Sequence, residues 1–329
     1  MAVVAAWGPL SWRFESTDEA ELAWLDAHFH VSAVSASACR RFVDVRSVRD
    51  DDRIGSLTHL PADRAPVRIR ETWYRGVRAD DGLAWTTARS GDLPAHAFVR
   101  HARDRWSVLV AEEPRSPRPA EILVRALVVD ELVRGGGVAL HASAAANPSG
   151  AMVFTGDGGA GKSTLAAWCA RSGGHLVAGD RIVVLPGGVA VGAAVAPRFG
   201  WGTVAALGRV GAVRGARLLR PDAVRADKVV LTQREMGDLM GIATSDSVVV
   251  DAFVAVERTT GPLVVERVSP DEATAVVLRH RVPADVGWAA EADGSATAAL
   301  IAGRPVLRLR WDPLTHSAEH ALEHLREAT

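Results

Sequence analysis

The sequence has few cysteines and no long apolar segment. Its 329 residues include only two cysteines, Cys39 and Cys169, which are far apart in the chain. Two thiols are too few for a disulfide framework, and this usage is typical of a reducing compartment. No uncharged apolar run is long enough to span a membrane, and the N-terminal residues lack the basic and apolar segments of a signal peptide. We therefore expect a cytoplasmic protein with no membrane partner.

An excess of charge of either sign is also missing. The 38 Lys and Arg residues nearly balance the 39 Asp and Glu residues, which gives a formal net charge of −1 at pH 7. Without a basic field, nothing favours nucleic acid as a partner. With 48% hydrophobic and 23% charged residues, the composition is that of a globular protein with a sizeable core.

Lysine is the rarest of the charged residue types. Only Lys162 and Lys228 occur among the 38 basic residues, so 38 − 2 = 36 are arginines. A lysine inside a sequence motif is therefore more informative than usual, because chance matches are rarer. Lys228 lies outside any motif, and it could be either a ligand-facing lysine or an ordinary exposed one.

The length of the chain favours two domains. Three prolines in Glu113–Pro119 interrupt regular structure, because proline lacks a backbone donor and restricts the residue before it. We place a domain boundary there, between a smaller strand-rich domain over residues 1–118 and a second domain over residues 119–329. In the first domain, Ser16 and Glu19 have the spacing of a capping box, which predicts a helix that begins there.

Apolar segments of helical and strand type alternate in the second domain, which predicts an α/β arrangement. The predicted helices span residues 120–134, 162–171 and 315–327. The predicted strands span residues 138–142, 151–154, 176–178, 182–185, 247–256 and 305–309. Glycine-rich turns separate several of these elements.

A phosphate-binding motif lies between a predicted strand and a predicted helix. Residues 156–163 read Gly-Asp-Gly-Gly-Ala-Gly-Lys-Ser and match G-x-x-x-x-G-K-[ST]. The glycines allow backbone N–H groups to surround phosphate oxygens, and the N-terminus of the helix favours the same anion. Lys162 would contact the β- and γ-phosphates, and the Ser163 hydroxyl would ligate Mg²⁺. We expect ATP, with GTP as an alternative, to bind Gly156, Asp157, Gly158, Gly159, Ala160, Gly161, Lys162, Ser163 and Thr164.

Two polar residues flank this motif. Asp180 follows the strand that comes directly after the motif helix, and strand ends of this type bind ligands in α/β proteins. Its carboxylate could hold Mg²⁺, or it could be a solvated turn residue. His141 lies one hairpin upstream and could belong to the site or be an ordinary packed or exposed histidine.

Together, Leu140–Ser143, Gly156–Thr164 and Ala178–Arg181 resemble the catalytic domain of HPr kinase/phosphorylase. The resemblance is closer to shorter HPr-kinase-like proteins that are often encoded beside peptide natural-product genes. It covers the chain from about Glu121 to the C-terminus, and its specific part spans residues 138–184. It implies a P-loop α/β fold with a mixed sheet and flanking helices.

The resemblance also implies a function and a set of site residues. The function is ATP- and Mg²⁺-dependent phosphorylation of a serine hydroxyl on a protein or peptide, by a protein that can form homo-oligomers. By position, Lys162 would bind phosphates, Ser163 and Asp180 would bind the metal, and His141 would lie beside the acid–base group. The catalytic residues would then be His141, Lys162 and Asp180, and the N-terminal domain becomes a candidate region for acceptor recognition.

One position departs from the family pattern. The family has two consecutive aspartates where this chain has Gly179 and Asp180, and the first aspartate is thought to be the general base. A positioned base is worth roughly 10²–10⁴-fold in rate. Asp180 or His141 could replace it, or the acceptor could need little help from a base. The alternatives to a kinase acting on a peptide, protein or small-molecule hydroxyl are a nucleotide-binding accessory protein and an NTPase coupled to conformational change.

Overall fold

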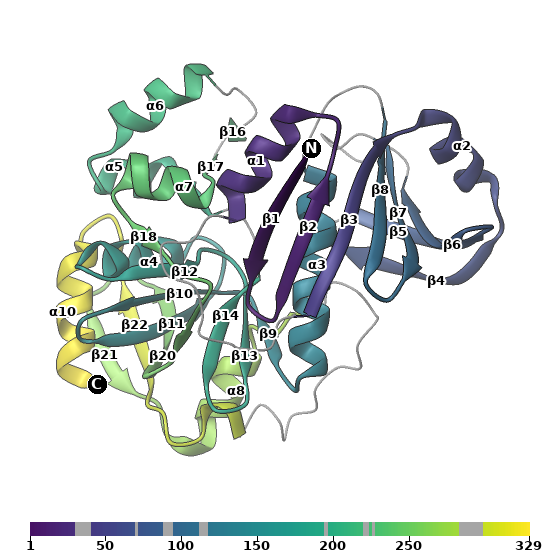
Figure 1. Cartoon of the computed structure of the whole chain (residues 1–329). Helices are drawn as coiled ribbons and strands as arrows, with labels where there is room; N and C mark the ends of the chain where they lie inside the picture. Colours follow the sequence, from purple (N-terminus) through teal and green to yellow (C-terminus); the bar gives the residue numbers. More distant parts are fainter. Residues whose placement is uncertain are drawn as a thin grey trace. The chain divides into compact units, whose positions relative to one another are not determined.

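The computed structural model describes residues 1–29, 41–69, 72–87, 95–111, 118–193, 197–219, 224–225, 228–282 and 299–329. These residues form a mixed α/β protein with four sheets and flanking helices (Figure 1). Cys39 and most of the predicted break at Glu113–Pro119 lie outside them. The chain divides into two compact units within α3 (Arg118–Arg134), after Glu131.

The first unit contains an eight-stranded sheet in the order β1-β2-β3-β8-β7-β6-β5-β4. Neighbouring strands are antiparallel except that β3 runs parallel to both β2 and β8. The strands are β1 (Ala2–Trp7), β2 (Leu10–Glu15), β3 (Arg41–Arg49), β4 (Ala62–Ile69), β5 (Thr72–Ala79), β6 (Gly82–Thr87), β7 (His96–Ala102) and β8 (Arg105–Val110), and the helices are α1 (Glu19–Phe29) and α2 (Asp51–His59).

The start of α1 differs from the predicted capping box. Asp18 caps the helix, because its Oδ1 accepts the backbone N–H groups of Ala20 at 2.9 Å and Glu21 at 3.2 Å. The Ser16 hydroxyl instead donates to the Glu21 carboxylate at 2.7 Å. The predicted box of Ser16 with Glu19 is therefore wrong, although a helix does begin at Glu19.

The second unit is built on a seven-stranded mixed sheet in the order β18-β12-β10-β11-β20-β22-β21. Its strands are β10 (Ala142–Asn147), β11 (Gly150–Gly156), β12 (His175–Ala178), β18 (Ala243–Thr244), β20 (Ala252–Arg258), β21 (Val264–Arg267) and β22 (Val306–Trp311). β11 lies between the antiparallel β10 and the parallel β20, and β20 is parallel to β22. The carboxyl ends of β11, β20 and β22 therefore meet at one edge of the sheet.

Two smaller sheets and several helices complete this unit. One sheet has the order β19-β14-β13-β9 and contains β9 (Val138–Leu140), β13 (Ile182–Leu185), β14 (Val189–Gly192) and β19 (Ser247–Val249); the other has the order β15-β17-β16 and contains β15 (Arg198–Gly200), β16 (Val224–Arg225) and β17 (Lys228–Val230). The helices are α4 (Lys162–Arg171), α5 (Trp201–Ala206), α6 (Val210–Leu219), α7 (Gln233–Glu235), the π-helix η2 (Met236–Met240), α8 (Pro270–Leu278) and α10 (Ala318–Ala328).

The predicted elements of the second domain are present, but only the helix over 162–171 and the strand over 182–185 have the predicted bounds, and the strand predicted over 138–142 is divided at His141. The helix predicted over 162–171 is α4, with the same ends. The strand predicted over 247–256 is two strands, because residues 247–249 pair with β14 in one sheet and residues 252–258 pair with β11 in another. The last helix begins at Ala318 rather than near Thr315, since the Ser317 hydroxyl accepts the His320 N–H and caps it there.

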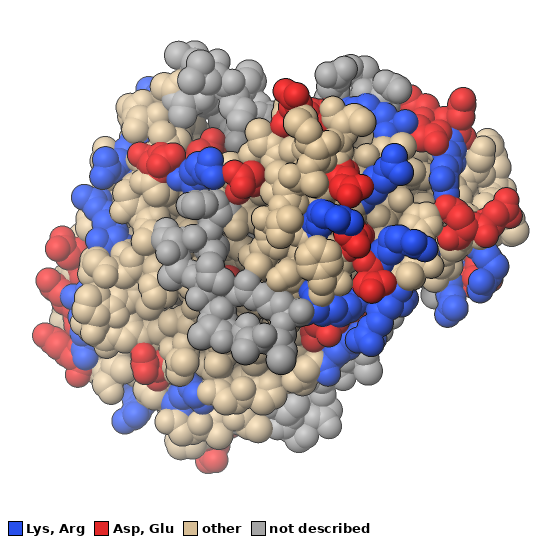
Figure 2. Space-filling view, viewed as in Figure 1, with Lys and Arg blue, Asp and Glu red and all other residues tan. Residues whose placement is uncertain are grey.

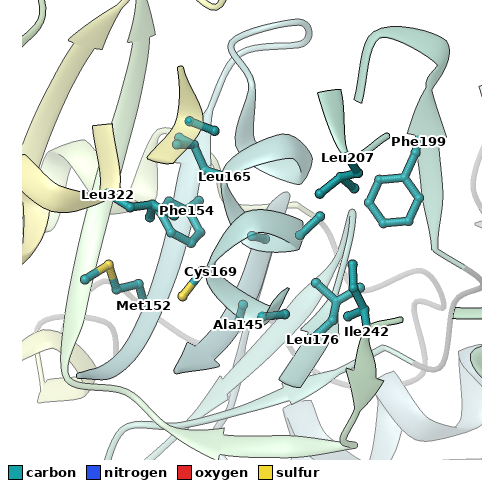
Figure 3. Packing of buried hydrophobic residues seen from close by; sticks show 14 of the residues in the cluster. Ala145, Met152, Phe154, Leu165, Cys169, Leu176, Phe199, Leu207, Ile242 and Leu322 are labelled. Carbon is teal, nitrogen blue, oxygen red and sulfur yellow. The ribbon is translucent and has the colours of Figure 1, made fainter. Parts of the chain in front are cut away.

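Alternate residues of the central strands pack into two separate apolar clusters. Met152 and Phe154 of β11 face α4 and α10, whereas Val153 faces the side of the sheet that α8 covers. In the first cluster, Leu165 and Cys169 of α4 are fully buried against Phe154 (Figure 3). Burial raises the pKa of the Cys169 thiol to about 12, so this cysteine stays protonated and unreactive. This packing fixes the N-terminus of α4 beside the carboxyl end of β11.

The surface charges and the lengths of the apolar helices in the described residues agree with the composition of the sequence. On the face drawn in Figure 2, lysine and arginine side chains are interspersed with aspartate and glutamate. Within the described part of the chain, no helix has both the length and the apolar character that crossing a bilayer requires.

Candidate functional site

The glycine-rich loop between β11 and α4 packs closely against two strands of the sheet. Gly156 and Gly161 have φ values of 143° and 101°, in the region that favours glycine. A Cβ on Gly161 would lie 2.4 Å from Cζ2 of Trp311, and a Cβ on Gly156 would lie 2.3 Å from the Val256 carbonyl oxygen. The indole Nε1 of Trp311 also donates to the Ala160 carbonyl at 2.8 Å. The loop is therefore held closely against β20 and β22.

Lys162 lies across this loop. Its side chain is buried, and Nζ donates to the carbonyl oxygens of Gly156 at 2.6 Å and Asp157 at 2.9 Å. Burial lowers the pKa of Lys162, while the nearby Asp180 and Asp157 carboxylates act in the opposite direction. The ammonium is thus held by neutral carbonyls, so an anion beside the loop would offer it a stronger partner.

Two hydroxyls converge on the carbonyl of Gly179. Ser163 Oγ donates to this oxygen at 2.6 Å, and Ser143 Oγ donates to it at 2.8 Å. These bonds connect the first turn of α4 and the strand β10 to the chain just after β12. Because each hydroxyl uses its proton in this way, the lone pairs of Ser163 Oγ stay available to a cation.

His141 and Asp180 lie beside each other at the same end of the sheet. Their Nδ1 and Oδ1 atoms are 3.5 Å apart, and their side chains are 39% and 42% exposed. The backbone N–H of His141 donates to the His280 carbonyl at 2.8 Å. Burial lowers the pKa of His141; Asp180 raises it, and Lys162 lowers it further. The imidazole is therefore mostly neutral at neutral pH and can accept a proton.

These groups line one cavity of about 700 Å³, within the usual size range of small-ligand sites. The predicted residues that reach it are His141, Gly158, Gly159, Gly161, Lys162, Ser163, Thr164 and Asp180. The remaining predicted loop residues, Gly156, Asp157 and Ala160, line a second cavity instead. The structure therefore brings the three predicted catalytic residues together and divides the loop between two cavities.

Several lining residues carry no signal in the sequence. Arg198 of β15 and Lys228 of β17 reach the first cavity from a small sheet in which Gly200 pairs with Lys228. Thr203 of α5 exchanges a 2.7 Å hydrogen bond with Thr164. In the sequence, Lys228 is notable only because lysine is rare, and Arg198 and Thr203 belong to no motif. Tertiary pairing brings these residues to the loop from distant segments, so no local pattern predicts them.

Metal binding at this cavity would depend on few protein atoms. Asp180 is the only carboxylate among the described residues that line it, and Ser163 supplies a hydroxyl oxygen. No group of three His, Cys, Asp or Glu side chains in the described ranges is arranged to hold a metal ion by itself. A hard cation such as Mg²⁺ often binds one or two protein oxygens together with water and ligand phosphates, which fits this pair.

The histidines predict how stability depends on pH. Burial lowers the pKa of His141, His175 and His280 below the ordinary value of about 6.5. Below pH 6.5 the unfolded chain therefore binds protons that the folded chain does not, so the free energy of unfolding should fall as pH decreases. Thermal unfolding at pH steps between 7.5 and 5.5 should show a falling Tm, with a shallower fall in His175→Gln. A Tm that is constant or rises towards pH 5.5 would contradict these pKa directions.

Known proteins give no independent guide to this site. Comparison of the sequence with protein-family models and with curated proteins finds no match in either set. The chemistry of the cavity must be inferred from its own groups: a glycine-rich loop, a buried ammonium, two serine hydroxyls and a histidine beside a carboxylate.

Proposed function

We propose that this protein is an ATP- and Mg²⁺-dependent kinase of the HPr-kinase-like type, which transfers the γ-phosphate to a hydroxyl of a peptide, protein or small molecule. GTP is the alternative nucleotide. The observation that carries the proposal is the position of Lys162 at the start of α4, in one cavity with the His141–Asp180 pair. The mixed sheet with α4 and α10 on one side and α8 on the other supports a P-loop fold of this type.

Electrostatics favour a polyanion in this cavity. Lys162, Arg198 and Lys228 line it, and Asp180 is the one carboxylate among its described lining residues. The N-terminal N–H groups of the ten-residue helix α4 add a partial positive charge at the loop. A triphosphate would replace the carbonyl partners of Lys162 with phosphate oxygens, and charge-assisted hydrogen bonds are the stronger kind.

Mg²⁺ would be held between the protein and the nucleotide. Ser163 Oγ and Asp180 are the residues that would ligate it, with water and phosphate oxygens completing the shell. When bound, the ion neutralises charge that develops on the phosphates during transfer. The hydrogen bond that Ser163 Oγ donates to the Gly179 carbonyl keeps this serine oriented for the role.

The transfer step moves one phosphoryl group and one proton. The acceptor hydroxyl oxygen forms a bond to the γ-phosphorus, the bond from that phosphorus to the β–γ bridging oxygen breaks, and the diphosphate leaves with the electron pair. The hydroxyl proton passes to the neutral imidazole of His141 or to Asp180. The distance of 3.5 Å between these two side chains allows Asp180 to stabilise the imidazolium that forms on His141.

Gly179 favours a second candidate, a nucleotide-binding accessory protein without efficient transfer. This position has no carboxylate, and its carbonyl is already occupied by two serine hydroxyls. Such a protein would bind Mg²⁺ and nucleotide tightly but phosphorylate no acceptor.

Substitution of Lys162 tests the kinase proposal. Incubation of the protein with Mg²⁺, γ-labelled ATP and a panel of serine peptides and small hydroxy compounds should label an acceptor, which mass spectrometry would identify by one added phosphate. Lys162→Ala should lower the labelling rate by roughly 100-fold or more, because it removes the charge nearest the transferred group. The exposed Arg267→Ala is the control and should leave the rate unchanged. Equal labelling by Lys162→Ala would exclude the role given to this lysine.

Substitution of Gly179 separates the two candidates. A Cβ there would lie 3.7 Å from the nearest backbone atoms, those of Pro197 and Arg198, which is ordinary contact. If His141 or Asp180 already serves as the base, Gly179→Asp should raise transfer less than about tenfold, whereas restoring a lost base would raise it roughly 10²–10⁴-fold. Gly179→Asn has nearly the same shape without the charge and controls for packing. A large gain in Gly179→Asp alone would favour the accessory protein.

A further inference from the structure

A second cavity of about 430 Å³ lies against the same loop. Its walls are the loop residues 156–160, the ends of β20 and α8, and Arg308 of β22. It shares Gly158 and Gly159 with the first cavity and no other lining residue. The two cavities therefore border the same short segment of loop backbone but are otherwise lined by different helices and strands.

The second cavity is lined by arginines, two of which form no ion pair with the described carboxylates. Arg308 is already bound, because it lies 3.2 Å from Glu257 and 2.9 Å from Glu266. Among the described residues, the exposed side chains of Arg258 and Arg279 form no ion pair or hydrogen bond. Two guanidinium groups in one cavity are suited to a carboxylate or a phosphate, which they can bind with paired hydrogen bonds.

The end of α8 is tied to the strand that precedes His141. The His280 carbonyl accepts the His141 N–H at 2.8 Å, and Leu140 forms a backbone bridge with Arg281. The His280 side chain lines the second cavity. Burial lowers its pKa, with Asp157 raising it and Lys162 lowering it, so the imidazole lies in the electrostatic field of the loop. The cavity is thus close to the groups that would surround a terminal phosphate.

In-line phosphoryl transfer restricts where an acceptor can bind. The attacking and leaving oxygens lie on opposite sides of the transferred phosphorus. If the nucleotide occupies the first cavity, the acceptor must reach the terminal phosphate from the side opposite the nucleoside diphosphate. A cavity that adjoins the first one at Gly158 and Gly159 and has otherwise different walls offers the acceptor an approach separate from that of the nucleotide.

We propose that the second cavity binds the acceptor, and that this acceptor carries a carboxylate or phosphate close to its hydroxyl. Arg258 and Arg279 hold the anionic group, and the hydroxyl extends past Gly158 into the first cavity, where the His141–Asp180 pair takes its proton. This inference rests on the proposed kinase function, since it assigns the first cavity to the nucleotide. It names the substrate class as an acidic hydroxyl compound, either a peptide or a small hydroxy acid.

The test uses the full chain saturated with Mg²⁺ and a non-hydrolysable ATP analogue, so that the first cavity is filled. Inorganic phosphate is then titrated as the probe by calorimetry. Arg279→Gln should weaken phosphate binding by about 10- to 150-fold, the range for loss of hydrogen bonds to a charged group. Arg267→Gln, an exposed arginine of β21, is the matched control and should bind like the wild type. Absence of phosphate binding up to 20 mM (about 2 kcal/mol of affinity), or equal binding by Arg279→Gln, would overturn the proposal.

Competition distinguishes the sources of the acid. Glycerate and an N-acetylated, C-amidated Ser-Asp peptide should displace phosphate, whereas glycerol and the equally blocked Ser-Asn peptide should not; the acid that competes better identifies a small-molecule or a peptide acceptor. If neither acid displaces bound phosphate, the cavity is a site for inorganic anions and the acceptor role is wrong. Failure of the nucleotide analogue to bind at all would overturn the kinase proposal itself. Binding of the analogue without an Arg279-dependent second anion would overturn only the acceptor site.

Discussion

The indole of Trp311 holds the loop on which the candidate site depends. It donates to the Ala160 carbonyl and lies where a side chain at Gly161 would otherwise stand. Since α4 begins at the next residue, this contact also sets the start of the helix and the direction of Lys162. Ser163 follows and is oriented by the Gly179 carbonyl. A contact between residues 151 positions apart in the chain therefore determines the placement of the groups proposed to bind phosphate and metal.

Burial and nearby charges together determine the protonation of the groups around this loop. Lys162 is buried among carbonyl oxygens, and the pKa of both His141 and His280 is lowered, so a buried cation and two mostly neutral imidazoles lie beside the loop. This arrangement is electrostatically compatible with the negative charge of a triphosphate and with a proton acceptor beside it. The two cavities have different walls and share Gly158 and Gly159, so under the proposed function a nucleotide and an acceptor would reach the same loop backbone by different entrances.

Local patterns predict the loop and the elements beside it. The glycines, Lys162 and the apolar periodicity of residues 162–171 are signals within a short stretch, and α4 has the predicted ends. The contributions of Trp311, Arg198 and Arg279 could not be predicted in this way, because tertiary pairing brings them to the loop from distant strands and helices. The capping of α1 by Asp18 was missed because it depends on which of several nearby polar side chains accepts the N–H groups of the helix. The break between β19 and β20 was missed because the two segments pair with strands of different sheets.

The central claim is that this loop binds a nucleotide together with Mg²⁺. The most direct measurement is calorimetric titration of the purified full-length chain with ATP, in the presence of Mg²⁺ and in the presence of a chelator. We predict saturable binding of one ATP per chain that weakens at least about tenfold without Mg²⁺, because the Asp180 carboxylate can engage the phosphates only through the ion. No binding, or binding of equal strength with and without Mg²⁺, would contradict the claim.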